Sequence, residues 1–234
     1  MTTVKKYYNI TVLSDNNVML FLWGDYLKQD KETRNKLLHS AREEFMEKGY
    51  LKASLRNICK NAGVTTGALY FFFQDKEDLF DAVTRETVNA ISRIIQSHFE
   101  EENDIVASGV SLTPDAVDHQ KDFGVAKELL HHMYLHREEV LLILTKCQGT
   151  KLENIADVFI ETAEKHYRKM ADAMQKENPG SIVDDKFIHW LSHEQIDAFI
   201  YAITHIEDEE EAMRFISQAL VYMMAGWYGL FLKK

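Results

Sequence analysis

Cysteine and proline are scarce in this sequence, and glycine is not abundant. Cys59 and Cys147 are the only cysteines among 234 residues, which excludes a disulfide framework and suits a reducing compartment. Two prolines and ten glycines are few helix breakers for this length, so long helices are expected. Because no alternation of apolar and polar residues runs long enough to predict strands, the sequence indicates an all-α protein.

The sequence also lacks an apolar run long enough to cross a membrane. The nearest candidate, VMLFLWGDYL at residues 18–27, falls short of the ~20 residues that a spanning helix needs. The polar stretch SDNN precedes it and would interrupt a secretory signal core, and no small-residue cleavage site follows. We therefore expect a cytoplasmic protein with no membrane partner.

The charges are unevenly distributed along an acidic chain. The formal net charge is −10, which argues against a protein that coats nucleic acid along its whole surface. Residues 1–96 nevertheless carry a net charge of +2, and residues 97–234 carry −12. Within residues 48–76, five basic residues stand against one acid. A basic region on an acidic body is typical of a protein that contacts a polyanion with one end.

Helix signals begin at residue 31. Apolar residues recur every three or four positions up to Gly49, where the helix is expected to end. Ser54 can cap a second, short helix that Gly63 would stop, and Thr65 can cap a third. Asp75 can cap a long fourth helix. Two short helices separated by a glycine turn predict a helix-turn-helix.

Residues 37–83 combine several short patterns in one register. Their sequence is LLHSAREEFMEKGYLKASLRNICKNAGVTTGALYFFFQDKEDLFDAV. It contains F-x-x-x-G-[YF] at the end of the first helix, [ST]-[LV]-R-x-I in the second, A-G-V before the turn, and G-x-L-Y-x-x-F-x-x-K-E-x-L. In these features it resembles the DNA-binding domain of TetR-family transcriptional regulators. The resemblance extends over about a fifth of the chain.

The resemblance implies that the third helix enters the major groove of double-stranded DNA. A helix approaches base edges closely only when its leading residues are small, and the segment TTGA fits that need. The resemblance implies that Thr65, Thr66 and Gly67 contact base edges and that Arg56 contacts a base. It implies that Tyr70 and Lys76 contact phosphates and that Ser54 contacts the DNA backbone.

The aromatic run at the end of the third helix divides between core and surface. Leu69 and Phe73 lie four apart and are expected in the three-helix core, with Phe71 beside them. Phe72 departs from the family, which usually has a polar phosphate donor there, so either that contact is lost or the ring packs on sugar or core. Thr66 departs too, because many members carry a long polar residue at its position.

The remaining chain reads as helical blocks at about 115–145, 151–177, 184–206 and 208–231. Apolar stripes run along the last two blocks, and small residues such as Ala219 and Gly226 allow close helix approach. The resemblance implies that these two helices pair with a second copy as a four-helix homodimer interface. The residues expected there are Phe199, Ile203, Ile216, Leu220, Met223, Met224 and Trp227.

The middle helices supply apolar and aromatic residues for a small-molecule pocket, although a packed core would look the same. The candidates for pocket residues are Met133, Tyr134, Tyr167 and Trp190. The histidine pairs His132/His136 and His189/His193 have metal-site spacing, but spacing supplies no third ligand, so we expect no metal and no cofactor.

Nothing in the sequence predicts catalysis. No nucleophile elbow or phosphate-binding glycine loop is present, so we expect no enzyme activity. Cys147 is expected to be a buried residue, with a redox-sensing thiol as the alternative.

We therefore predict three parts: an N-terminal extension of unclear role at 1–30, a helix-turn-helix DNA-binding domain at 31–80, and a helical effector-binding and dimerisation domain at 81–234. Residues 1–30 are read as an ordered arm, a capping strand or helix, or residues upstream of the true start. The expected function is a DNA-binding transcriptional regulator that responds to an unknown small molecule. We expect it to be a repressor that binds a palindromic operator as a homodimer. Two alternatives stay open: a helical small-molecule or metal-binding protein, or a dimerising adaptor, with a vestigial DNA-binding head.

Overall fold

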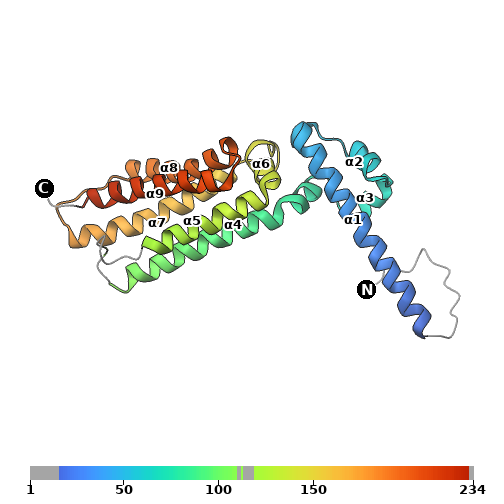
Figure 1. The fold of residues 1–234 in the computed structure, drawn as a ribbon, viewed down its shortest axis with the longest axis horizontal. Coiled ribbons are helices and arrows are strands. Elements are labelled where there is room, and N and C mark those ends of the chain that lie inside the picture. Colours follow the sequence, from blue (N-terminus) through green and yellow to red (C-terminus); the bar gives the residue numbers. More distant parts are fainter. Residues whose placement is uncertain (1–15, 110–111, 113–118, 232–234) are drawn as a thin grey trace.

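The protein is all-helical in the part of the chain that the structure, a computed structural model, describes. The backbone is described for residues 16–109, 112 and 119–231, and the side chains for these residues except 16–28 and 119. Within these ranges the chain forms nine helices and no strand, which confirms the predicted fold class (Figure 1). The helices are α1 (Asn16–Lys52), α2 (Leu55–Ala62), α3 (Thr66–Phe72), α4 (Lys76–Ala107), α5 (His119–Leu135), α6 (Arg137–Thr145), α7 (Ile155–Glu177), α8 (Asp185–His205) and α9 (Glu209–Gly229).

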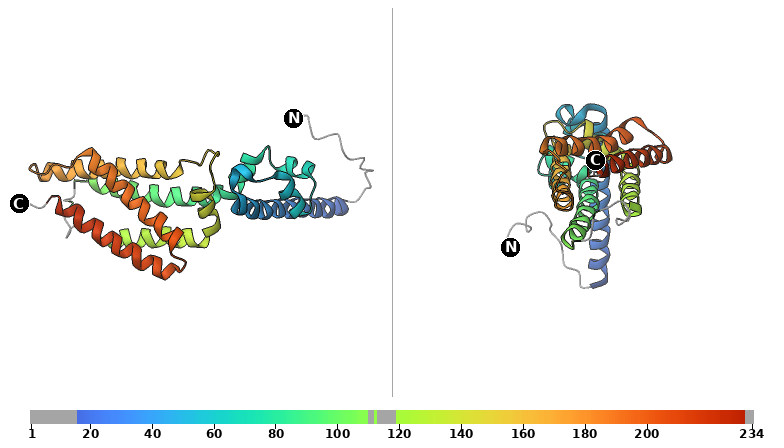
Figure 2. Two further views of the ribbon diagram at one scale, coloured as in Figure 1. Left: turned by 90° about the horizontal axis from the view of Figure 1, so that it is seen from above. Right: turned by 90° about the vertical axis from the view of Figure 1, so that its left-hand side faces the viewer.

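The helices form a small head and a larger body at opposite ends of an elongated molecule (Figures 1 and 2). Helices α1, α2 and α3 make the head together with the start of α4. Helices α5 and α7 pack along the rest of α4, and α8 and α9 pack on α7 and α5 to complete the body. Because α4 belongs to both parts, it connects them directly. Helix α6 lies at the junction and contacts both α1 and α4.

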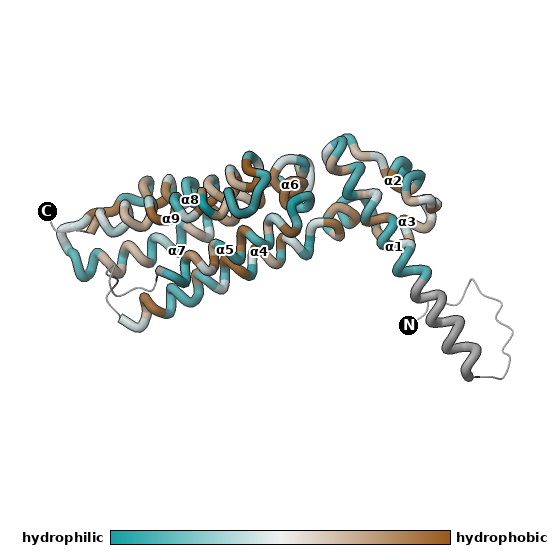
Figure 3. Tube along the Cα trace, viewed as in Figure 1, coloured by the Kyte–Doolittle hydropathy of each residue, from teal (hydrophilic) through white to brown (hydrophobic). Residues whose placement is uncertain are grey.

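Hydrophobic and hydrophilic residues alternate along the helices, as expected for helices that bury one face (Figure 3). None of the helices in the described ranges is both long and apolar enough to cross a membrane.

Helix α1 begins earlier than the sequence pattern predicted. It starts at Asn16 and not near residue 31, because residues 16–30 contain no proline and only one glycine to interrupt it. Gly49 breaks the helical geometry with φ 71° and ψ 161°, as expected for a glycine at a helix end. Of the proposed extension at residues 1–30, residues 1–15 lie outside the described residues.

The head is built around one apolar cluster. Its fully buried side chains come from α1, α2, α3 and α4, with Leu142 added by α6, and include Phe45 and Phe80, whose ring centres are 5.0 Å apart in an edge-to-face arrangement. Gly63 turns the chain between α2 and α3 in the left-handed conformation, with φ 67° and ψ 30°, as predicted. Thr65 and Asp75 cap α3 and α4 through their side chains, also as predicted.

The block predicted at 115–145 is two helices. The chain leaves the helical conformation at His136, with φ −116° and ψ 38°, although neither glycine nor proline is present. Contacts with α8 hold the break: the Tyr134 hydroxyl donates to the carbonyls of Ala202 and Ile206, and Arg137 donates to the carbonyl of Ile203. Tertiary contacts, which sequence periodicity does not report, therefore decide where α5 ends.

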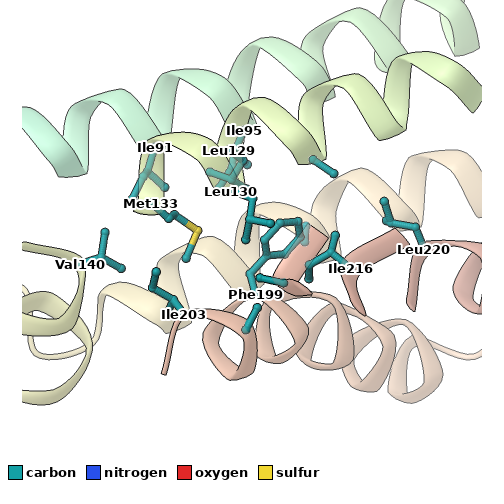
Figure 4. Close-up of a cluster of buried hydrophobic side chains, with 14 of the residues drawn as sticks. Ile91, Ile95, Leu129, Leu130, Met133, Val140, Phe199, Ile203, Ile216 and Leu220 are labelled. Carbon is teal, nitrogen blue, oxygen red and sulfur yellow. The ribbon is translucent and has the colours of Figure 1, made fainter. Parts of the chain in front are cut away.

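The stripes predicted to form the dimer interface face inward. Phe199 and Ile203 of α8 and Ile216 and Leu220 of α9 point into the core of the body, toward α4 and α5 (Figure 4). Each is more than nine-tenths buried within one chain, as is Trp227 in a second cluster at the far end of the body. Met223 and Met224 are half-buried.

The prediction for these residues is therefore corrected: five of the seven have almost no surface left for a partner. The apolar stripe of an amphipathic helix shows that a face is buried, but not against what. In this protein the face is covered by the body's own helices.

Candidate functional site

The N-terminal end of α3 presents a small, exposed surface on the head. Thr65, Thr66 and Gly67 are all exposed, and the Thr65 side-chain oxygen accepts a hydrogen bond from the Ala68 amide at 3.1 Å. Leu69, two residues after Gly67, is completely buried in the head core. The helix is therefore held firmly by its inner face, and its leading end is open to a partner.

Two aromatic side chains stand on the outer face of the same helix. Tyr70 is 59% exposed, as a phosphate-contacting residue would have to be. Phe71 is 67% exposed, so its predicted place in the core is wrong. Each residue of an α-helix is rotated by about 100° from the one before it, so positions 70 and 71 point outward when Leu69 points inward. This periodicity could have identified Phe71 as an exposed residue from the sequence. Phe72 is half-buried against the head core.

Basic side chains are exposed on α2 and at the end of α1, the elements that precede α3. Lys52, Arg56 and Lys60 are exposed and make no ion pair with any residue whose side chain is described. Lys48 differs, because its ammonium is paired with Glu44 at 2.8 Å. Three of the five basic residues predicted to face a polyanion therefore keep their charge available to it.

Lys76 has partners within the head. Its ammonium donates to the carbonyl oxygens of Tyr50 at 2.8 Å, Leu51 at 3.2 Å and Ala53 at 3.4 Å. It also lies 4.5 Å from the centre of the Tyr50 ring. These contacts attach the start of α4 to the end of α1, a role that the sequence did not reveal.

Ser54 does not cap α2 through its side chain, contrary to the prediction. The carboxylate of Glu44 holds the start of α2 by other contacts: its Oε1 accepts from the Ser54 amide at 3.0 Å and from the Asn57 side chain at 3.4 Å. Burial alone would raise the pKa of Glu44, but hydrogen bonds from Lys48, Ser54 and Asn57 outweigh it, and the pKa is lowered.

The body contains a cavity of about 130 Å³ between α4, α5, α7, α8 and α9. Most of its lining is apolar, with contributions such as Phe99, Leu129 and Met223. Most polar groups lie on α4, α5 and α7, namely His98, Glu102, Asp122, His166 and Tyr167, and α8 and α9 add Gln195, Trp227 and Tyr228. An apolar cavity with a few polar groups is the usual form of a small-molecule site.

Of the four predicted pocket residues, only Tyr167 lines this cavity. Met133 is buried in the core of the body (Figure 4), and the Tyr134 hydroxyl is bound to backbone carbonyls. Trp190 is on the exposed side of α8. The prediction missed the contribution of α4, because it searched only the middle helices.

Two tyrosines of the cavity are held in the neutral form. Burial, followed by the charges of Glu102 and Asp122, raises the pKa of Tyr167 far above its usual range. Burial and the same carboxylates raise the pKa of Tyr228 to about 12. Both hydroxyls therefore remain protonated at neutral pH and can donate a hydrogen bond.

The two histidine pairs named from the sequence are near neighbours, with ring centres 4.6 Å apart for His132/His136 and 4.7 Å for His189/His193. Neither pair belongs to a group of three possible metal ligands in the described part of the chain. Cys147 is buried, and burial raises the pKa of its thiol, which favours the structural interpretation over a redox sensor.

Sequence comparisons place the head in a known family. The model described as "Bacterial regulatory proteins, tetR family" matches residues 37–83. The transcriptional regulator UidR of Escherichia coli K12 is 29% identical over 202 residues, which cover 83% of this chain and 92% of that protein. The transcriptional repressor BepR of Brucella suis is 44% identical over 52 residues, which cover 22% of this chain and 25% of that protein.

Solved structures share the fold at low sequence identity. NalD, a secondary repressor of the MexAB-OprM multidrug efflux pump in Pseudomonas aeruginosa, has a TM-score of 0.52 at 21% identity, covering 84% of this chain and 97% of that one. A TetR/AcrR-type transcriptional regulator from Aquifex aeolicus has a TM-score of 0.50 at 20% identity, covering 82% and 99%. The match of residues 37–83 and the regulators among the relatives agree: this chain carries the DNA-binding domain of a TetR-family transcriptional regulator.

Proposed function

We propose that this protein is a ligand-responsive repressor that binds a palindromic operator as a homodimer. The observation that carries the proposal is the construction of α3: its leading residues Thr65, Thr66 and Gly67 are small and exposed, while Leu69 anchors the helix in the core. Such a helix can enter the major groove without moving its own support.

The surroundings of α3 support a division of labour in DNA binding. Thr66 and Arg56 are exposed where base edges would lie, and we assign them to sequence preference. Tyr70, Ser54 and Lys76 are assigned to the DNA backbone, which positions the helix without reading sequence. For Lys76 the contact competes with its bonds to the end of α1, so part of its contribution is to hold the head together.

The proposed dimer uses the outer faces of α8 and α9, which lie on one side of the body (Figure 1). Tyr201 of α8 and Val221 and Tyr222 of α9 are exposed apolar or aromatic side chains there. Ala225, Gly226 and Gly229 follow on α9 and are exposed, so a second copy can approach its backbone closely. Two heads on one dimer would read two half-sites of a palindrome.

The proposed response to a ligand is a linkage between the cavity and the head. Helix α4 lines the cavity and begins in the head, while α6 connects the body to α1. At that junction Arg42 of α1 is 2.7 Å from Glu139 of α6, and the Tyr50 amide donates to the Lys146 carbonyl. A coupling of ~1–3 kcal/mol would change operator affinity ~5–150-fold.

The three-part division at 1–30, 31–80 and 81–234 belongs to the same proposal, with α4 crossing its last boundary. The repressor assignment draws on the names of BepR and NalD, which are repressors. Since the proposed target is chromosomal DNA, we place the protein in the cytoplasm.

The experiment that tests the proposal is selection of bound fragments from random DNA by the purified protein, read by sequencing at near-physiological salt. We expect a palindromic motif whose half-site spacing reflects the dimer. Affinity for the selected site should fall with salt at a slope of roughly −0.9 per phosphate neutralised. Folded protein that enriches no sequence would exclude operator binding and favour a protein whose function lies in the helical body.

A further inference from the structure

We propose that His98, Glu102 and Asp122 bind a divalent transition-metal ion in the wall of the cavity. His98 and Glu102 are one turn apart on α4, so their side chains share a face, and Asp122 comes from the neighbouring helix α5. One possible ligand atom from each lies within 4.8 Å of the other two. Among residues with described side chains, no other group of three meets this condition.

The separations between the donors match those of metal ligands. His98 Nε2 is 3.5 Å from Glu102 Oε2 and 3.8 Å from Asp122 Oδ1. Two ligands that are each about 2.1 Å from a tetrahedral ion are about 3.4 Å apart. The two pairs that include His98 therefore need to close by only a few tenths of an ångström to coordinate an ion, and the Glu102 and Asp122 oxygens lie within 4.8 Å of each other.

The surroundings favour a positive charge between these groups. Each of the three side chains is less than one-fifth exposed. Two carboxylates held close together away from water repel each other, and a cation between them offsets that repulsion.

His166 of α7 is placed to orient one of the proposed ligands. Its Nε2 is 2.7 Å from Glu102 Oε2, which is hydrogen-bonding distance and closer than two ligands of a tetrahedral ion would be. The imidazole is only 4% exposed and stacks on Phe99 with ring centres 4.3 Å apart. A hydrogen bond to a ligating carboxylate is the usual second contact of a metal site, so we assign His166 a positioning role.

Three protein ligands leave a coordination position for a water or a small ligand in the cavity. Polar groups able to hold such a molecule line the same cavity. The Trp227 indole nitrogen and Gln195 Oε1 are buried and have no hydrogen-bond partner among the described residues. Trp227 is 6% exposed, so bulk water does not satisfy its N–H.

The donor set selects the class of ion. One imidazole with two carboxylates suits Zn²⁺, Co²⁺, Mn²⁺ or Fe²⁺. Mg²⁺ and Ca²⁺ prefer oxygen donors alone, and the absence of thiolate or thioether from this group argues against Cu⁺.

A metal at this place would join α4 to α5 at the end of α4 remote from the head. This step rests on the function proposed above, in which the ion acts as an effector or a co-effector. Saturating Zn²⁺ should then change operator affinity ~5–150-fold, as for other coupled sites.

The test uses the full chain, stripped of metal by a chelator. Zn²⁺ affinity is measured by competition with a chromogenic chelator, and Co²⁺ binding by its visible absorption. We expect one ion per chain. His98→Gln and Asp122→Asn, which remove a ligand each, should weaken Zn²⁺ binding more than the ~10–100-fold expected for His166→Gln, whose effect is indirect.

His189→Ala is the matched control, because His189 and His193 are close neighbours but belong to no group of three possible ligands in the described part of the chain. It should leave Zn²⁺ affinity unchanged. Thermal unfolding of each metal-free variant verifies that it folds, and the two ligand variants serve as independent tests. Folded wild-type protein that binds no ion would overturn the site, as would wild-type affinity in both ligand variants. Zn²⁺ binding without selection of any DNA sequence would keep the site and overturn the proposed function instead.

Discussion

Glu44 is a buried acid that joins α1 to the start of α2 in the head. Its carboxylate is almost completely buried and accepts hydrogen bonds from the Lys48 ammonium, the Ser54 amide and the Asn57 side chain. It thereby fixes the start of α2 relative to α1. Because α2 supports α3, a single buried acid determines how the proposed recognition helix is presented.

Acid should remove this contribution. The pKa of Glu44 is lowered from its ordinary value of 4.5, so its stabilising effect is present above pH 4.5 and is lost as the pH falls through the folded value. Glu44→Gln should lower the free energy of unfolding by ~1.5–3 kcal/mol at pH 7, the range for a hydrogen bond to a charged group.

Urea unfolding of the wild type and the variant at pH 7 and at pH 3 measures this. The difference between them should shrink at the lower pH. Glu43→Gln, at the exposed neighbouring position, is the control and should change stability little. A difference that is the same at both pH values would show that Glu44 acts through packing and not through its charge.

Tyr70 offers the sharpest test of a single DNA contact. Its hydroxyl is exposed on the outer face of α3, where a phosphate would lie. Tyr70→Phe should weaken binding to every DNA sequence by ~1.5–3 kcal/mol without changing which sequence is preferred. Dissociation constants for the selected operator and for unrelated DNA at one salt concentration measure this.

Tyr222→Phe removes the hydroxyl of another exposed tyrosine, on α9 of the body, while keeping the ring that the proposed dimer uses, and it should leave DNA binding unchanged. A loss restricted to the operator would instead mean that Tyr70 contacts a base.

Helix α6 makes a second connection between head and body, beside α4. It is short, and α5 ends just before it at a break held by contacts with α8, so its direction is set by the body. Its other side meets α1 through the ion pair of Arg42 and Glu139, in which Glu139 is nearly buried and Arg42 is about two-thirds buried. A shift of the body can therefore reach the head through α6 as well as along α4.

A double-mutant cycle on this pair tests the junction. Arg42→Met and Glu139→Gln should each destabilise the protein, because each leaves a partly buried charge without its partner. The double variant should lose less than the sum, with an interaction energy of ~0.5–3 kcal/mol in urea unfolding. Glu138→Gln, at a more exposed position 3.9 Å from Arg42, is the control. Strictly additive effects would show that the pair carries no coupling.

At this scale the sequence predicts what is local. Gly63, Thr65 and Asp75 act within one turn of their own position, and their roles as helix signals are confirmed. Ser54 makes no side-chain cap, and the start of α2 is held instead by Glu44, ten residues earlier, which accepts from the Ser54 amide and which local sequence signals do not report. The break at His136 and the cavity depend on contacts between distant helices, so periodicity could not locate them.

The whole molecule raises the question of which surface remains for a second copy. The predicted stripe covers the body's own core, so a dimer must use what lies outside it. On α8 and α9 that outer surface includes Tyr201, which packs on Phe215 with ring centres 5.2 Å apart, and Tyr222, which is 76% exposed. Large exposed aromatic groups beside small residues are typical of an interface.

Tyr222→Glu should therefore convert the protein to monomers at concentrations where the wild type is dimeric. A buried carboxylate facing its symmetry mate is strongly unfavourable, and in a two-fold interface the substitution occurs twice. Sedimentation velocity measures the mass, and operator binding should weaken in parallel because two half-sites are no longer engaged together.

Val158→Glu places the same charge at an exposed apolar position of α7, away from this surface, and should leave the dimer intact. If both Tyr222→Glu and Tyr201→Glu remain dimeric, the two chains meet elsewhere. If Val158→Glu alone dissociates them, α7 supplies the interface, and the spacing of the heads must be derived from that side of the body.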